Sequence, residues 1–399
     1  MNPIKMNIES LPIEVYLFLI VSLLFLIQLS YYSLLYSQLI RIRKKSKKGK
    51  IAYEETPPPL SIIISAENAT EKLKKQLPLL LEQEYPEYEV IVINNSTDPA
   101  EVEATNDLLE RLKSTYSHLY FSFTPESARY ISRKKLSLTL GIKASKYDWL
   151  VFTEPDFCPV SNQWLQKIAR NFTASTDLVL GYAGYPEEKS LKNLKMIYAS
   201  IFDAIQHLGS AILKHPYKGY GKNLAYRKEA FFRNKGYSSH LNLLRGEDDL
   251  FINQIATSTN TRVELSPESI VKYEANNQYN YWKNERQNYA LSSYCYKGSH
   301  RHILGIEACS RFLFYLTSII GLIIAIKSHN YLWSVFFLGL FCLRYLFQGI
   351  ILNQSAHILG YKRNFILSLP LLDLWLPLHN LKIKIRLLFK GKRNYMRKE

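Results

Sequence analysis

The sequence predicts an α/β fold in which helices cover both faces of a mostly parallel sheet, with transmembrane helices at the N- and C-terminal ends. Between residues 60 and 184, short apolar runs alternate with helical patterns, which is typical of parallel strands joined by crossover helices. Apolar stretches suited to membrane spans lie at 13–37, 312–326 and 331–352. The 399 residues leave room for one sizeable enzyme domain between these stretches.

Residues 13–37 predict the first spanning helix, because they carry one acid near their start, no basic residue, and enough length for about 30 Å of hydrocarbon. A basic run follows at 41–50, whereas a cleaved signal peptide has its charges first. The positive-inside rule therefore places residues 1–12 outside and the following chain in the cytoplasm. Residues 38–59 then form a basic juxtamembrane linker that ends in three prolines.

Two further spans are predicted at 312–326 and 331–352, which are separated only by KSHN and form an antiparallel helical hairpin. Arg344 is the one charge within them. Such an arginine either snorkels or pairs with another group, or it marks a path for a lipid or polymer, and the sequence leaves both readings open. With three spans, the chain is expected to be a multi-pass protein of the inner (cytoplasmic) membrane.

The segments that flank the hairpin are expected to lie at the membrane surface. Residues 291–311 form an interfacial segment. Residues 365–380 are apolar but are interrupted by two prolines and an acid, so an interfacial or re-entrant helix fits them better than a span. This helix and the basic tail after it make up 365–399, with the tail in the cytoplasm.

The formal charge of +17 indicates a membrane surface rather than a nucleic acid. Residues 41–50 and 381–399 together hold 14 of these net charges, and both runs lie beside apolar segments. The rest of the chain is close to neutral. We therefore do not expect the chain to bind nucleic acid.

The cytoplasmic segment is predicted to form one α/β domain at 60–290. Apolar runs such as LSIIIS and YEVIVI alternate with helical patterns and turn-forming polar groups. The predicted strands are 60–65, 88–93, 119–123, 149–153 and 178–184. The predicted helices are 71–84, 134–145 and 161–172. Ligands of such sheets bind beyond the carboxyl ends of the strands, so the polar residues there are the candidates for a site.

Acidic residues follow the fourth predicted strand. Glu154 and Asp156 are spaced one apart, so both can point the same way and hold a divalent cation that grips a diphosphate. Acids are also common in the turn before a helix, and on these residues alone both readings stay open.

A second acidic group, Glu247-Asp248-Asp249, precedes an apolar helical stretch. Adjacent acids that are buried together resist ionisation, which raises a pKa toward a value suited to a general base. The alternative reading is that acids favour a helix N-terminus through capping and the helix dipole.

In their order along the chain, these signals resemble family 2 of the glycosyltransferases with the Rossmann-like GT-A fold, over roughly residues 58–290. The similar strings are SIIISAEN, VIVINNSTD, KKLSLTLGIKA, FTEPDF, GYGKNLAYRK and the Glu-Asp pair. By this resemblance, the catalytic residues are Asp248, as base, and Glu247. The nucleotide-sugar contacts are Asn68, Asn94, Asn95, Asp98, Lys134 and Glu154. The metal ligands are Asp156 and Glu154, and the acceptor-side residues are Asn223, Arg227 and Trp282.

Three departures from the family pattern concern the donor and the acceptor. Asn94 and Asn95 stand where many members carry Asp, and an amide still bonds a uracil edge without adding charge. Glu154 replaces the first Asp of the metal motif. The Gln-x-x-Arg-Trp motif of processive members is represented only by QYNYW and ERQNY, so Trp282 either stacks on a sugar or anchors the chain at the interface.

The resemblance implies an inverting, hexosyltransferase-type enzyme of the bacterial cell envelope. It would move a sugar from a nucleotide donor, with a UDP-sugar favoured, to a membrane-associated lipid or polysaccharide acceptor. Oxygen ligands favour Mg²⁺ or Mn²⁺ as the cation. Partner subunits for export are also expected. The alternative is a catalytically silent GT-A-like membrane subunit that binds nucleotide or polymer and assists a partner.

Overall fold

A computed structural model describes residues 12–125 and 132–390, and the chain divides into two compact units. In described residues, the first unit comprises 12–37, 298–354 and 364–379, and the second comprises 38–297, 355–363 and 380–390. Residues 1–11 of the predicted external N-terminus and 391–399 of the predicted basic tail lie outside the described residues.

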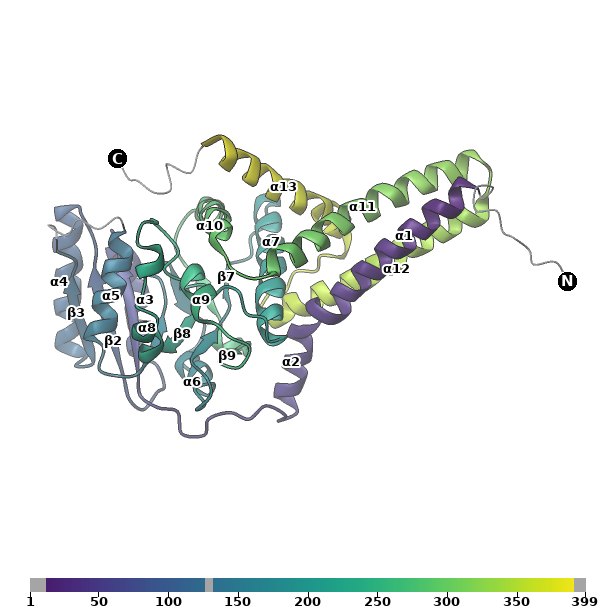
Figure 1. Cartoon of the computed structure of the whole chain (residues 1–399). Coiled ribbons are helices and arrows are strands. Elements are labelled where there is room, and N and C mark those ends of the chain that lie inside the picture. The colour runs from purple at the N-terminus through teal and green to yellow at the C-terminus, as the bar shows by residue number, and fades with distance from the viewer. Residues whose placement is uncertain (1–11, 126–131, 391–399) are drawn as a thin grey trace. The chain divides into compact units, whose positions relative to one another are not determined.

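The larger unit is an α/β domain built on a seven-stranded sheet with helices packed around it (Figure 1). The strand order is β3-β2-β1-β4-β8-β6-β9. Its strands are β1 (Leu60–Ala66), β2 (Tyr88–Asn94), β3 (Leu119–Phe123), β4 (Trp149–Phe152), β6 (Leu178–Leu180), β8 (Leu224–Arg227) and β9 (Thr261–Val263). A smaller sheet has the order β5-β10-β7, with β5 (Phe157–Pro159), β7 (Ala183–Gly184) and β10 (Val271–Tyr273).

The helices of this unit alternate with the strands in the first half of the chain. They are α2 (Gln38–Lys47), α3 (Thr70–Leu81), α4 (Pro99–Thr115), α5 (Arg133–Ala144), α6 (Trp164–Ala169), α7 (Leu191–Ile212), α8 (Lys228–Arg233), α9 (Asp249–Ile255) and α10 (Gln278–Ser292). The predicted mostly parallel α/β fold is confirmed. The sheet departs from the parallel pattern at β8, which runs antiparallel to both β4 and β6.

The strand order places a ligand site between β1 and β4. Chain connections lead from β1 outward to β2 and β3 on one side and return to β4 on the other side of β1, with Ile62 paired to Val90 and Val151. Parallel sheets bind ligands at such a switch point, outside the carboxyl ends of the strands. All of β4 and nearly all of β1 are buried, as expected for strands in the middle of a sheet covered on both faces.

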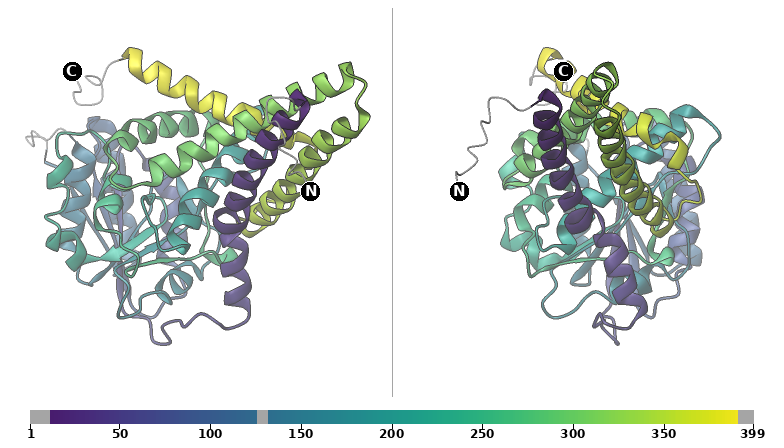
Figure 2. Two further views of the ribbon diagram at one scale, coloured as in Figure 1. Left: turned by 45° about the vertical axis from the view of Figure 1, so that its right-hand side comes forward. Right: turned by 90° about the vertical axis from the view of Figure 1, so that its right-hand side faces the viewer.

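The smaller unit is helical. Its elements are α1 (Ile13–Ser30), the π-helical turn Tyr31–Tyr36, α11 (His300–Lys327), most of α12 (Tyr331–Ile358) and the first part of α13 (Leu369–Lys390). Among the described residues, three helices are long and apolar enough to cross a membrane: Ile13–Lys47, α11 and α12. Figure 2 shows α1, α11 and α12 running side by side, and Val21, Phe314 and Phe337 form the buried core between them.

Arg344 is buried in this helical unit and is paired. Its guanidinium donates to Asp373 Oδ2 at 2.8 Å, and Arg311 donates to Asp373 Oδ1 at 2.9 Å. Arg311 also pairs with Glu307 at 3.1 Å, so the two arginines and two acids balance in charge. All four side chains are at most 3% exposed. Of the two readings of Arg344, the structure therefore supports pairing.

Replacing Asp373 with Ala leaves Arg311 and Arg344 buried without their shared carboxylate. We expect unfolding of the full chain in detergent to become easier by about 3–5 kcal/mol, the usual cost of removing one partner of a buried ion pair. The measurement is the thermal midpoint. Asp107→Ala, which removes an exposed carboxylate on α4, serves as the control and should not move the midpoint. An equal midpoint for Asp373→Ala and wild type would contradict the account of this network.

Candidate active site

A small cleft, partly open to solvent, lies at the carboxyl ends of β1 and β4. It brings together four of the residues predicted from the sequence, namely Lys134, Glu154, Glu247 and Asp248. The remaining lining residues are Ser65, Leu138, Phe152, Thr153, Gly221, Leu224, Tyr226 and Tyr237. The site therefore lies where the strand order predicts it.

Lys134 is the central cation of the cleft. It stands in the first turn of α5, whose N-cap Ser132 accepts from the amide of Lys135. Its ammonium lies 2.7 Å from Glu154 Oε1 and 3.0 Å from Glu247 Oε1. Burial lowers the pKa of Lys134, but the charges of Glu154 and Glu247 outweigh it and raise the pKa well above its ordinary value. The lysine is charged at any physiological pH.

Glu154 has both carboxylate oxygens engaged within the protein. Lys134 holds Oε1, and the hydroxyl of Tyr281 donates to Oε2 at 2.6 Å. Burial raises the pKa of Glu154, but the charges of Lys134 and Lys222 and these hydrogen bonds bring it down to about 2. Lys222 itself forms an ion pair with Glu285 at 3.1 Å.

Asp248 is the N-cap of α9 and also faces the cleft. Its Oδ1 accepts from the amide of Asp249 at 2.7 Å, and its Oδ2 accepts from the amide of Gly221 at 2.9 Å and from the hydroxyl of Tyr289 at 2.7 Å. Burial and the nearby charge of Glu247 raise the pKa of Asp248. Asp248 can therefore both cap the N-terminus of α9 and serve as a general base.

Glu247 differs from its neighbour in its electrostatics. Burial raises the pKa of Glu247, but the charges of Lys134 and Arg245 outweigh it and lower the pKa. Its Oε2 is buried and accepts no hydrogen bond from the part of the chain that the structure describes. Glu247 therefore stays ionised, with one oxygen that has no hydrogen-bond partner among the described residues.

Asp249 is fully buried behind the cleft. Its Oδ2 accepts hydrogen bonds from Ser292 and, at 2.6 Å, from Tyr296, and its Oδ1 accepts from the amide of Leu250 at 2.8 Å. Burial and the charge of Asp248 raise the pKa of Asp249 to about 7.

Helix α10 supplies site residues that the sequence analysis missed. Tyr281 contacts Glu154, Glu285 contacts Lys222, Tyr289 contacts Asp248 and Ser292 contacts Asp249. These four residues follow one another at intervals of four, four and three, so they form one stripe along the helix. Tyr281 and Tyr289 lie within the QYNYW and ERQNY strings, and the helical period of polar residues there was the available signal.

Of the residues predicted to contact the nucleotide, some already form hydrogen bonds within the protein, whereas Asn95 does not. The amide of Asn94 donates to the carbonyl of Val102 and to Asn106, so it serves the fold. Asp98 caps α4 by accepting from Ala100 at 3.1 Å. The side chain of Asn95, in contrast, is 1% exposed, and neither its oxygen nor its nitrogen has a hydrogen-bond partner among the described residues.

Asn68 stands in the loop after β1, where its backbone has a left-handed φ of 47°. Its amide donates to the hydroxyl of Ser96 at 2.9 Å, and its side chain is exposed. The loops that follow β1 and β2 are thereby joined beside Asn95.

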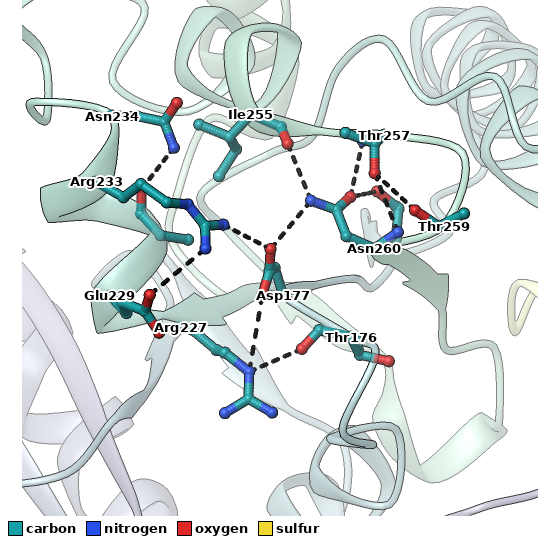
Figure 3. Close-up of polar contacts among 12 residues, drawn as sticks. Thr176, Asp177, Arg227, Glu229, Arg233, Asn234, Ile255, Thr257, Thr259 and Asn260 are labelled. Carbon is teal, nitrogen blue, oxygen red and sulfur yellow. Dashed lines mark hydrogen bonds and ion pairs between the residues drawn. The ribbon is translucent and has the colours of Figure 1, made fainter.

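Two of the predicted acceptor-side residues lie outside the cleft. Asn223 is buried and donates to the carbonyls of Tyr182 and Ser269. Arg227 pairs with Trp149 across the sheet, at the start of β4 rather than at its end. Figure 3 shows Arg227 beside Thr176 and Asp177, where its Nε donates to the Thr176 carbonyl at 2.9 Å. The 219–228 element instead contributes Gly221, Leu224 and Tyr226 to the lining of the cleft.

Trp282 lies on α10 but is buried at 3% exposure. The guanidinium of Arg286 lies 5.7 Å from its ring centroid, and the ring of Tyr279 lies 5.6 Å away. The indole packs within the domain.

Asp156 forms an ion pair with Lys72 of α3 at 2.8 Å. The lysine side chain is 39% exposed, so a bound cation can displace it. Within residues 12–125 and 132–390, no three His, Cys, Asp or Glu side chains cluster as a complete metal site. A metal here would need ligands from a substrate as well.

A protein-family model described as "Glycosyl transferase family 21" matches residues 23–379. The chain belongs to glycosyl transferase family 21. The match covers the α/β domain, α11, α12 and the part of the first apolar helix from residue 23 onward. The resemblance to glycosyltransferases found in the sequence is thereby confirmed. The family whose model matches is family 21, whereas the sequence motifs resembled family 2. No curated protein matches this chain.

Solved structures similar to this chain include a mannosyltransferase. The mannosyltransferase PcManGT from Pyrobaculum calidifontis, in complex with GDP-Man and Mn²⁺, is 15% identical with a TM-score of 0.54, covering 95% of this chain and 99% of that one. This likeness supports the GT-A fold. Residues 1–349 of S. aureus TarS match at 16% identity and a TM-score of 0.42, covering 76% of this chain and 88% of that one.

The raised pKa of Asp249 predicts a pH dependence of stability. The folded carboxyl titrates near 7 and the unfolded one near 3.8, so the folded state binds more protons between these values. Stability should therefore fall as pH rises through this window. In Asp249→Asn, the hydroxyls of Ser292 and Tyr296 can turn to accept from the new amide. We expect the drop in thermal midpoint from pH 5 to pH 8 to be smaller in this variant than in wild type. The same drop in both proteins would contradict the assignment.

Proposed function

We propose that the chain is an inverting, hexosyltransferase-type enzyme that uses a nucleoside-diphosphate sugar, with a UDP-sugar favoured, and a membrane-associated acceptor. The cleft at the β1/β4 switch point carries the proposal. There the ammonium of Lys134 and the carboxylate of Asp248, with its raised pKa, line the same space. A cation suited to a leaving diphosphate and a base suited to a hydroxyl are the two groups that such a transfer requires.

The proposed reaction is a single displacement at the anomeric carbon. The acceptor hydroxyl gives its proton to Asp248 as its oxygen forms the new bond to carbon. The bond from that carbon to the diphosphate oxygen breaks, and the diphosphate leaves with the electron pair, so the configuration inverts. Lys134 stabilises the charge that develops on the diphosphate. Glu154 and Glu247 hold the ammonium of Lys134 in place for this role.

The nucleobase is proposed to bind beside Asn95. Both atoms of its side-chain amide are buried without hydrogen-bond partners among the described residues, and so is the hydroxyl of Thr124, just beyond β3. Leaving such groups unpaired costs about 1–3 kcal/mol each, which a base edge would recover. An amide that both donates and accepts matches the edge of uracil.

A divalent cation, Mg²⁺ or Mn²⁺, is proposed to bind at Asp156. Glu154 fits a metal poorly, because Lys134 and Tyr281 engage both of its oxygens. Asp156 fits better, since its one cationic partner in the described chain is the displaceable Lys72. Mg²⁺ commonly combines one or two carboxylates with phosphates of a substrate. When bound, the cation would neutralise part of the diphosphate charge.

The three apolar helices support a multi-pass protein of a bacterial inner membrane. By the positive-inside rule, the basic run in α2 supports a cytoplasmic α/β domain, on the side where nucleotide sugars are made. The acceptor would then be a glycolipid or a nascent cell-surface polysaccharide at that membrane, with partner subunits where export follows.

Asp248→Asn should abolish most turnover and leave donor binding intact. The amide cannot take the proton, so we expect kcat to fall about a hundredfold to ten-thousandfold. The assay is release of nucleoside diphosphate in membranes that carry the full chain, with UDP-glucose, UDP-N-acetylglucosamine or GDP-mannose and Mn²⁺ or Mg²⁺.

Asp107→Asn, an exposed acid on α4, is the matched control and should turn over like wild type. Turnover with none of these donors would favour the silent-subunit alternative. Full activity of Asp248→Asn would remove Asp248 as the base.

Asn94→Ala and Asn95→Ala separate fold from recognition at adjacent positions. Asn94→Ala loses hydrogen bonds to Val102 and Asn106, so we expect a lower thermal midpoint. Asn95→Ala should keep the midpoint and weaken UDP binding about three- to tenfold. Calorimetric titration of UDP into the detergent-solubilised chain measures the second effect. Unchanged UDP affinity in Asn95→Ala would place the base elsewhere.

A further inference from the structure

Helix α10 runs past the charged groups of the cleft. Its stripe of Tyr281, Glu285, Tyr289 and Ser292 contacts in turn Glu154, Lys222, Asp248 and Asp249. We propose that Tyr289 is a positioning residue, which orients Asp248 so that its Oδ1 is the oxygen offered to the acceptor hydroxyl. This inference rests on the proposed function.

The hydrogen bonds to Asp248 define which oxygen is available. An ionised carboxylate offers about four lone-pair positions, two on each oxygen. Oδ2 accepts both from the Gly221 amide and from the Tyr289 hydroxyl, so its two positions are filled. Oδ1 accepts only from the Asp249 amide among the described residues, so one position remains. The hydroxyl that gives up its proton must approach there.

The position of the Tyr289 hydroxyl is itself fixed. Its ring lies 4.6 Å from the ring of Tyr220, the residue before Gly221, so both donors to Oδ2 belong to one packed group. One turn earlier on α10, Glu285 pairs with Lys222 at 3.1 Å. One turn later, Ser292 donates to Asp249. Contacts on both sides of Tyr289 therefore hold the helix against the acids.

Tyr281 and Tyr289 divide their roles along the helix. Tyr281 donates to Glu154 at 2.6 Å, and Glu154 holds the lysine assigned to the diphosphate. Tyr289 donates to the base at 2.7 Å. Removing the first hydroxyl should therefore affect the donor, and removing the second should affect proton transfer. A role of the helix in the fold alone would not separate the two effects.

The test compares Tyr289→Phe, Tyr281→Phe and the off-stripe control Tyr279→Phe, each in the full chain in membranes. Turnover is followed by release of nucleoside diphosphate from whichever of UDP-glucose, UDP-N-acetylglucosamine and GDP-mannose the wild type uses. In Tyr289→Phe the carboxylate loses a hydrogen bond that favours its charged form, so the acid limb of kcat/KM should move to higher pH. We expect kcat to fall about tenfold, with the donor KM within twofold of wild type.

In Tyr281→Phe the donor KM should rise several-fold with the acid limb unmoved, and Tyr279→Phe should match wild type in both. Protection of each variant by UDP against thermal unfolding confirms that it is folded. If Asp248→Asn is inactive while Tyr289→Phe keeps the wild-type acid limb and kcat, the positioning role is wrong and the proposed function stands. If Asp248→Asn turns over normally, the proposed function fails and this inference fails with it.

Discussion

The ammonium of Lys134 joins the parts of the cleft. It belongs to α5, and it binds Glu154 beyond β4 and Glu247 before α9, at 2.7 and 3.0 Å. Two buried carboxylates this close to each other and to Asp248 would repel without it. The positive charge also keeps Glu154 and Glu247 ionised while Asp248 titrates at a higher pH than usual. Neighbouring acids thereby acquire different protonation behaviour, which acid–base chemistry requires.

The buried charges of the helical unit pair with one another and balance. There Asp373 lies between Arg311 and Arg344, and the paired groups carry no net charge. Both oxygens of Asp373 are engaged, which fits a role in holding helices together. In the cleft, Glu247 retains a buried oxygen without a partner among the described residues. The network thus balances its charges within the chain, whereas in the cleft the single ammonium of Lys134 faces the carboxylates of both Glu154 and Glu247.

Much of the fold followed from the periodicity of the sequence. Continuous apolar runs predicted β1, β2 and β4 to within a residue, because strands buried on both faces need apolar side chains at nearly every position. The bounds of β3 were also predicted, although this strand is partly exposed. The antiparallel β8 was not predicted, since a four-residue strand has too little pattern to give its direction. The single strand predicted at 178–184 is instead two short strands, β6 and β7, which lie in different sheets. Strands this short have too little pattern to show where one ends and the next begins.

The candidate site was predicted in part. Lys134, Glu154, Glu247 and Asp248 meet in one cleft because the carboxyl ends of β1 and β4 are adjacent. Asn94 and Asn223 are polar residues that serve the fold, and a sequence cannot show whether an amide is already paired. Tyr281 and Tyr289 were missed because their partners lie 127 and 41 residues away, in contacts that only the folded chain reveals.

The central claim is that the Lys134 cleft binds a nucleoside diphosphate. An experimental structure of the full chain with UDP and Mn²⁺ tests it most directly. The account predicts the diphosphate within hydrogen-bonding reach of the Lys134 ammonium, the metal on Asp156 and the uracil edge against Asn95. A nucleotide bound elsewhere, with Lys134 still enclosed by Glu154 and Glu247, would contradict it.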